Sequence, residues 1–186
     1  LCTIERALPG SIMVNQRGER YLNEAASYHI TGQQMARRQQ EHGDASPTWF
    51  VFDHTYRHSY PVGPVYPLVP DWAQNGMVKT ILKKGRTIAE LAEAMGVDPA
   101  RLEATVARFN DHAARGEDPD FKRGEAAYDK MYGDPRVAPN PCLRPIEKGP
   151  FYAMPMYPGD IGTNGGLKTD ALARVLDAKG KPIGGL

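Results

Sequence analysis

The alternation of apolar and polar residues near the start of the chain predicts a β-hairpin. SIMVN at 11–15 alternates and is followed by QRGERY, in which Gly18 is placed to form a tight turn. Asn23 is then positioned to cap a helix from about residue 24 to residue 40, with Glu24 in its first turn, where the helix dipole favours a carboxylate. TWFVFD at 48–53 is continuously apolar and β-rich, which is typical of a buried strand.

Proline and glycine divide the middle of the chain. Prolines at 61, 64, 67 and 70 remove backbone donors and predict an extended loop. Thr87 and Glu90 have capping-box spacing before IAELAEAM, and Gly96 is placed to end that helix. Asp98 and Pro99 then begin a second helix, so this stretch predicts a compact helix pair.

The last third is rich in proline, glycine and aromatic residues. FYAMPMY reads as a strand interrupted at Pro155, which predicts a position at a sheet edge. GLKTDALARVLDAKGKPIGGL predicts two strands joined by an Asp-Ala-Lys-Gly turn. We therefore expect an α+β fold of mixed short strands with about three helices and long Pro/Gly-rich loops.

Composition narrows the function classes. The chain of 186 residues is 41% hydrophobic and 24% charged, as in a folded globular protein. Lys and Arg number 23 against 22 acidic residues, which favours no nucleic acid or anionic membrane as partner, and no apolar run approaches the length of a membrane span. The two cysteines, Cys2 and Cys142, lack paired spacing, so we expect a reducing, cytoplasmic compartment. The chain starts without Met and ends in a strand-like run, so we expect an internal piece of a longer protein.

A glycine-rich run at 159–166 is the first candidate for chemistry. Its amides are suited to an oxyanion or a cofactor approached closely by the backbone, although a set of tight turns explains the same residues. Tyr21, Glu24 and Tyr28 fall on one stripe of the predicted helix. Tyr28 is suited to proton transfer only if a neighbour lowers its pKa from about 10, and the alternative is an ordinary half-buried aromatic residue.

A second group of candidates surrounds residue 57. His54 and His58 have the spacing of two ligands on a helix, but the glutamate of a HExxH motif is missing and Pro61 disfavours a helix there, so we expect no metal site. Arg57 is a candidate contact for an anion or a carbonyl group. A structural ion pair is the alternative for Arg57.

Four motifs follow one another along the chain: PGSIMVNQRGERYLNEA, WFVFD, TIAELAEAMGVDPARLEATVARFN and the stretch from PNPCLRPIEKG through GDIGTNGG to KPIGGL. In this order they resemble the fumarate reductase and 3-ketosteroid dehydrogenase superfamily of flavoproteins, and the 3-ketosteroid Δ1-dehydrogenase-like members most. The resemblance implies a substrate-binding domain of the succinate dehydrogenase/fumarate reductase flavoprotein type at 1–150 and a truncated start of the returning FAD-binding domain at 151–186. It also implies FAD in the full-length parent, whose missing FAD domain is the expected partner, and none in the isolated chain.

The same resemblance implies roles for single residues. Tyr28 stands where the ketosteroid enzymes have a tyrosine that helps to remove a proton next to the carbonyl, and Gly165 stands where a backbone amide contacts the carbonyl oxygen. Arg57 is expected among the catalytic residues, because it is spaced after Phe52-Asp53 much as the proton-donating arginine of fumarate reductases is, and Arg57 and Tyr152 are expected to position the substrate. Ile161 stands where a second tyrosine is expected. Contacts to the cofactor are expected from the glycine run, at Gly162, Thr163, Gly165 and Gly166.

The departures from fumarate reductases decide the expected substrate class. Those enzymes carry arginine at the position of Tyr28 and histidine at that of Gly162, both suited to a dicarboxylate. A neutral, steroid-like ketone is therefore the expected small-molecule substrate, with the desaturation or reduction of a carbon–carbon bond next to its carbonyl as the reaction. The aromatic residues expected to wall it are Tyr56, Tyr60, Tyr66, Trp72 and Tyr152. A fumarate-reductase-like enoate reductase and an isolated ligand-binding cap without redox activity remain the alternatives.

Overall fold

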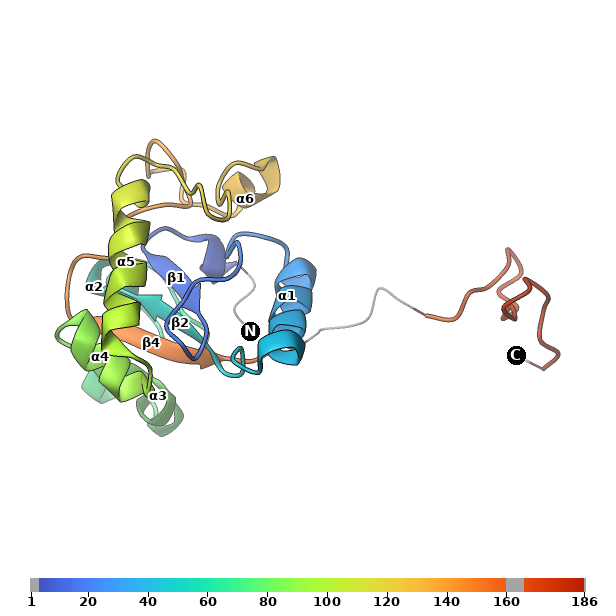
Figure 1. Ribbon diagram of the computed structural model, residues 1–186, viewed down its shortest axis with the longest axis horizontal. Coiled ribbons are helices and arrows are strands. Elements are labelled where there is room, and N and C mark those ends of the chain that lie inside the picture. Colours follow the sequence, from blue (N-terminus) through green and yellow to red (C-terminus); the bar gives the residue numbers. More distant parts are fainter. Residues whose placement is uncertain (1–3, 160–165, 186) are drawn as a thin grey trace.

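The computed structural model describes residues 4–159 and 166–185, and its centre is a four-stranded antiparallel sheet (Figure 1). The strands are β1 (Ser11–Val14), β2 (Thr48–Phe52), β3 (Lys83–Gly85) and β4 (Phe151–Met156), in the order β1-β2-β4-β3. Ile12 faces Val51, Phe50 faces Met154, and Lys84 faces Tyr152. The sheet therefore brings together β1, near the start of residues 4–159, and β4, near their end.

Helices cover both faces of this sheet. The α-helices are α1 (Tyr28–His42), α2 (His54–Ser59), α3 (Gly76–Ile81), α4 (Ile88–Met95), α5 (Pro99–Ala113) and α6 (Ala127–Met131), with short 3₁₀ turns η1 (Glu5–Ala7) and η2 (Asp71–Ala73). This confirms the mixed α and β class. The described residues hold more helices than the three or so expected, and the additional ones are short.

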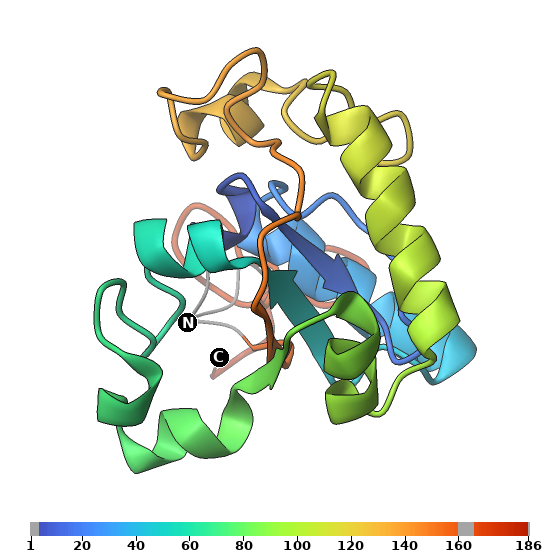
Figure 2. The ribbon, with the colours of Figure 1, turned by 90° about the vertical axis from the view of Figure 1, so that its left-hand side faces the viewer.

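Alternation along the strands separates two hydrophobic clusters. Ile12, Val51 and Ala153 point to the face covered by α4 and α5, whose apolar stripes complete the first cluster. Figure 2 shows α4 and α5 together on one side of the sheet. Met13 and Phe50 point the other way, into a cluster completed by residues of α1, α2 and α3.

The predicted helix pair is confirmed together with its caps. The Thr87 hydroxyl accepts the Glu90 N–H at 3.1 Å, and Gly96 ends α4 in the left-handed region at φ +75°. Asp98 caps α5, with Pro99 as its first residue. β3 can lie against α4 because Gly85 has no side chain, since a Cβ there would overlap the Leu91 backbone.

The predicted start of the first helix is wrong. α1 begins at Tyr28, and its cap is Ser27, whose hydroxyl accepts the Ile30 N–H at 3.4 Å. The Asn23 side chain instead accepts the Ala25 N–H at 2.8 Å and donates to Asp129 at 3.0 Å. The chain before residue 27 is therefore held by contacts outside the helix.

Two predictions on hairpins are only partly right. The turn at Gly18 is present, with φ +78°, but its second strand is reduced to one bridge between Val14 and Arg20, and β1 pairs with β2 instead. In the described segment 166–185 the turn at 177–180 is present, and its flanks form isolated bridges rather than regular strands.

The expectation of a helix-free segment around residue 57 is also wrong, because α2 forms over His54–Ser59. Asp53 caps it by accepting the Tyr56 N–H at 2.8 Å, and the helix ends before Pro61, so the proline limits its length without preventing it. β4 is likewise not an edge strand, because it lies between β2 and β3. β3 pairs only with Phe151–Ala153, however, so Pro155 lies where β4 has a partner on one side.

Candidate functional site

Tyr28 lies on the surface at the first position of α1. It is 39% exposed, so the residue is partly accessible from solvent. Tyr21 and Glu24 precede the helix and do not share a stripe with Tyr28. The predicted grouping of the three residues is therefore wrong, while the accessibility of Tyr28 suits the proposed proton transfer.

A buried arginine fixes the backbone in front of Tyr28. Arg6 is 2% exposed, and its Nη1 donates to the Glu24 carbonyl at 2.7 Å, to the Ala26 carbonyl at 3.3 Å and to the Thr31 hydroxyl at 2.8 Å. The Thr31 hydroxyl in turn lies 3.4 Å from the Ala26 carbonyl. These contacts connect η1 to the start of α1 and restrict the position from which the Tyr28 side chain projects.

Glu24 belongs to an ionic cluster whose side chains are 5% exposed or less, which we call the inner cluster and define as Arg20, Glu24, Asp118 and Arg123. Arg20 contacts Glu24 at 2.7 Å and Asp118 at 2.8 Å, while Arg123 contacts Glu24 at 3.3 Å. Glu24 also accepts the Met13 N–H at 3.0 Å. Burial alone would raise the pKa of Glu24, but the charges of Arg20 and Arg123 outweigh it and hold that pKa below its ordinary value. Glu24 is thus an ionised structural residue.

Arg57 and Tyr152 meet at a second cluster that the sequence did not reveal. Arg57 is 1% exposed and donates to the Tyr66 carbonyl at 2.8 Å and to the Val69 carbonyl at 2.6 Å. Tyr152 is 2% exposed. Asp71 joins them, because it lies 3.4 Å from Arg57 and accepts the Tyr152 hydroxyl at 3.3 Å.

Lys84 completes this loop cluster, which we define as Arg57, Asp71, Lys84 and Tyr152. Its ammonium lies 2.5 Å from the Asp71 carboxylate and 5.4 Å from the centre of the Tyr152 ring. Burial would raise the pKa of Asp71, but the hydrogen bond and charge of Lys84, together with Arg57, lower it. An isolated acid in an apolar, proline-rich loop was the only sequence signal for Asp71, since its partners lie far along the chain.

The expected aromatic wall is not assembled at one surface. Tyr56, Tyr60 and Tyr152 are buried in the second hydrophobic cluster, whereas Tyr66 and Trp72 are 62% and 79% exposed. The Tyr152 ring stacks on Phe52 at 5.7 Å between centroids. Tyr152 and Arg57 are therefore buried beneath the loop that they contact rather than exposed at an open surface.

His54 and His58 lie on one face of α2, with ring centroids 4.1 Å apart. Burial, followed by the neighbouring charges of His54 and Arg57, lowers the pKa of His58. Among residues 4–159 and 166–185, no group of three or more His, Cys, Asp or Glu side chains is arranged to hold a metal ion.

Of the expected substrate and cofactor residues, Ile161, Gly162, Thr163 and Gly165 lie outside the described residues. Gly166 is described; it is exposed, and the space beside its Cα is open, which is compatible with a ligand close to the backbone. The described sheet is antiparallel and offers no parallel βαβ turn for a pyrophosphate. Within the described part of the chain, Gly166 is thus the one candidate cofactor residue.

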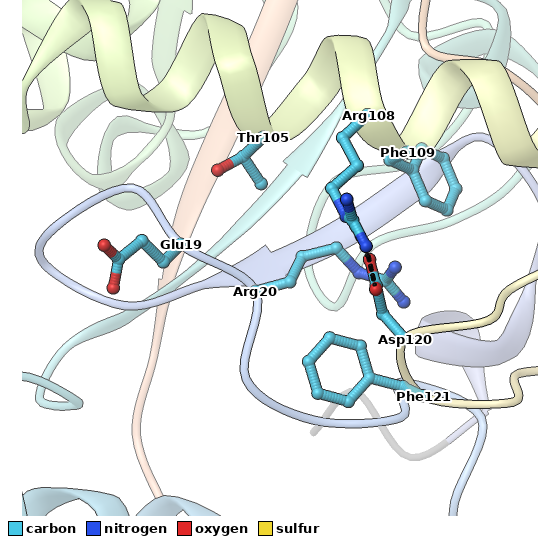
Figure 3. Close-up of a pocket in the computed structure, with 7 residues that line it drawn as sticks. All are labelled: Glu19, Arg20, Thr105, Arg108, Phe109, Asp120 and Phe121. Atoms are coloured by element: carbon cyan, nitrogen blue, oxygen red, sulfur yellow. Dashed lines mark hydrogen bonds and ion pairs between the residues drawn. The ribbon is translucent and has the colours of Figure 1, made fainter.

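A surface cavity of about 290 Å³ lies away from these residues (Figure 3). Arg20 enters it between Phe109 and Phe121, 5.0 Å from each ring centre, and Arg108 pairs with Asp120 at 2.5 Å. Because its charged groups already have partners, the cavity marks the outer edge of the inner cluster rather than a ligand site.

None of the described helices is long and apolar enough to cross a membrane.

Comparison with known proteins shows which proteins this chain is similar to. A 3-oxosteroid 1-dehydrogenase of Mycolicibacterium smegmatis is 41% identical over 98% of the chain, and a 4-oxocyclohexanecarboxylate 2-dehydrogenase of Sinomonas cyclohexanicum is 45% identical over 100%. The crystal structure of a 3-ketosteroid Δ1-dehydrogenase from Sterolibacterium denitrificans, in complex with 1,4-androstadiene-3,17-dione, matches 97% of the chain with 43% identity and a TM-score of 0.89. These relatives are named as dehydrogenases of oxo compounds, and each is similar to this chain over about a third of its own length.

The family follows from a match along the whole sequence. The family model described as "FAD binding domain" matches residues 1–186, and the chain belongs to this family. A flavocytochrome c3 fumarate reductase in its open conformation has a similar fold, with 25% identity over 97% of the chain and a TM-score of 0.56. The chain spans about a third of the length of the relatives it matches, with 32% of each of the two dehydrogenases covered. The resemblance noted in the sequence is thereby confirmed.

Proposed function

We propose that this chain is the substrate-binding part of an FAD-dependent oxidoreductase that desaturates a cyclic ketone next to its carbonyl, with a 3-ketosteroid as the first candidate. The observation that carries the proposal is the accessible Tyr28 at a rigidly held helix start. The names of the relatives support the substrate class, because the dehydrogenases of both M. smegmatis and S. cyclohexanicum are named for cyclic oxo compounds.

In the proposed reaction Tyr28 acts as its phenolate, its hydroxyl proton having passed to a base in the remainder of the longer protein, and it takes the proton from the carbon next to the carbonyl. The Gly165 amide stabilises the negative charge that develops on the carbonyl oxygen. Flavin, when bound by the parent protein, supplies the acceptor for the hydride. Arg57 and Tyr152 act as positioning residues, because they hold the 61–75 loop rather than project from it.

We place the boundary of the substrate-binding domain after Met156 rather than after residue 150. β4 is hydrogen-bonded to both β2 and β3, so residues 151–156 share the sheet of the preceding segment. The remainder of the chain begins the FAD-binding part. The isolated chain is expected to purify colourless, and stoichiometric flavin in such a preparation would contradict the division proposed here.

An enoate reductase is the second candidate. The likeness to a fumarate reductase structure favours it, as does a urocanate reductase of Eggerthella lenta that is 39% identical over 56% of the chain. Assaying the full-length protein with a ketosteroid, a 4-oxocyclohexanecarboxylate and fumarate separates the candidates. Turnover of fumarate far above that of both ketones would overturn the ketone assignment.

The role of Tyr28 is tested by Tyr28→Phe in the full-length protein. Loss of a proton-transfer group is expected to reduce turnover by about 100-fold or more at unchanged flavin content. Tyr128→Phe is the matched control, because Tyr128 has a similar exposure of 44% but lies on α6. If the Tyr28→Phe enzyme keeps more than about half of its turnover, Tyr28 has no part in proton transfer.

A further inference from the structure

The segment from Tyr66 to Met77, which runs from the loop after α2 into the first turn of α3, carries four strongly exposed apolar side chains. Tyr66, Leu68, Trp72 and Met77 are 62%, 80%, 79% and 62% exposed, and we call these four side chains the apolar loop surface. In Figure 2 the segment that carries them projects beyond the sheet on the side opposite α5. Exposed apolar side chains in this number within twelve residues of sequence are typical of an interaction surface.

This loop is firmly anchored. Val62 and Val65 are fully buried and exchange two backbone hydrogen bonds of 2.9 Å, and Val78 is buried at the far end. Between these anchors Arg57 donates to the carbonyls of Tyr66 and Val69. The exposed side chains therefore belong to a backbone that buried anchors and hydrogen bonds hold in place.

The backbone is strained at the centre of the surface. Leu68 has φ +65°, in the left-handed region, which is unfavourable for a residue that carries a side chain. It lies between the two carbonyls that Arg57 holds, so the buried guanidinium maintains this conformation. Strain of this kind persists where the surrounding structure requires it, and here it keeps the Leu68 side chain in solvent.

The near absence of charged residues from this loop indicates what kind of partner would bind to it. From Ser59 to Val78 the only Asp, Glu, Lys or Arg is Asp71, and it is paired with Lys84 and Arg57. A nearly neutral surface of aromatic and aliphatic groups does not attract nucleic acid or an anionic membrane. It matches the apolar centre of a protein interface, which is rich in Tyr, Trp and Met.

We propose that the apolar loop surface docks against the remainder of the longer polypeptide, outside residues 1–186. The relatives are about three times as long as the part that this chain covers, so the partner surface belongs to the same protein. The inference rests on the proposal that the chain is one part of a longer flavoenzyme, but it does not depend on the substrate. It assigns to Arg57 the task of presenting Leu68 to the other domain.

The experiment is alkylation of single cysteines in the full-length protein, measured on the peptide that carries each one. Leu68→Cys and Met77→Cys probe the surface, and Arg86→Cys is the matched control, because the Arg86 side chain is 88% exposed and lies between β3 and α4. Docking predicts that iodoacetamide modifies both probes at least about tenfold more slowly in the native than in the denatured protein, with little difference at the control.

The outcomes separate the possible occupants. Unprotected probes, or equal protection at the probes and the control, overturn the proposal. Protection that disappears on dilution assigns the surface to a second copy of the chain and also overturns it. Flavin content and ketone turnover are measured on the same samples, so an inactive protein with protected probes contradicts the proposed function and leaves the docking inference standing.

Discussion

The inner cluster and the loop cluster use the same chemistry in different surroundings. In the inner cluster the Glu24 side chain is completely buried, and both of its oxygens face arginines. In the loop cluster the Asp71 side chain is 36% exposed, and Arg57 is satisfied largely by backbone carbonyls. A missing carboxylate therefore leaves buried charge behind in the first cluster, whereas Arg57 in the second keeps two of its acceptors.

The difference shows what each cluster determines. The inner cluster connects β1, the 118–123 loop and the segment before α1, because Arg123 also donates to the carbonyls of Ser11, Arg6 and Leu8. It sets the fold around Tyr28. The loop cluster sets only how one surface loop lies on the sheet, so its loss should change recognition more than stability.

The largest effect is expected from Glu24→Gln. This change leaves Arg123 and Arg20 buried without their shared carboxylate, and removing one partner of a buried ion pair costs about 3–5 kcal/mol. Urea unfolding of the chain measures it. Glu41→Gln is the control, because Glu41 and Arg37 form an exposed pair on α1, and this change is expected to leave the midpoint unaltered. A loss below about 1 kcal/mol for Glu24→Gln would show that the inner cluster does not hold the fold.

Acid should act on the two clusters in the same direction. The pKa values of Glu24 and Asp71 are lowered in the folded chain, so the stabilisation is present above the ordinary carboxyl range near pH 4 and is lost as pH falls through the folded pKa values. The free energy of unfolding, measured from pH 7 down to pH 2, is expected to decrease once the pH is below about 4. The slope should be shallower in Glu24→Gln, and an identical slope would contradict the linkage.

The smallest effect on stability is expected from Asp71→Asn. Partly exposed ion pairs contribute about 1 kcal/mol or less, and Arg57 retains its carbonyl partners. The same change should make the 61–75 loop more accessible to protease. It should also alter the fluorescence emission of Trp72, the residue next to Asp71. Lys83→Met, at the neighbouring position of β3, serves as the comparison. Unchanged cleavage in Asp71→Asn would show that the carboxylate does not hold the loop.

Features encoded by neighbouring residues were predictable from sequence. Thr87, Asp98 and Gly96 define the ends of α4 and α5 because their capping bonds span only a few residues. The start of α1 was not predictable in this way, since Asn23 and Ser27 are both good caps. The choice depends on Glu24, which is fixed by Arg123, far along the chain.

The candidate site likewise contains residues that no local sequence pattern could indicate and residues whose roles came from a family resemblance. Asp71 finds its partners 13 and 81 residues away, so no local pattern could indicate the loop cluster. The roles of Tyr28 and Gly165 came from resemblance to a family and not from spacing. They stay predictions, whereas the accessibility of Tyr28 is a property of the fold.

The half-paired end of β4 bears on the solubility of this chain. Met154–Met156 has β2 on one side but no partner in β3 on the other, which leaves a short open edge of the kind that recruits strands from other molecules. Pro155 lies in that edge and has no N–H to offer an incoming strand. Pro155, which interrupts the strand pattern, thus disfavours edge-to-edge aggregation at the point where the chain leaves the sheet.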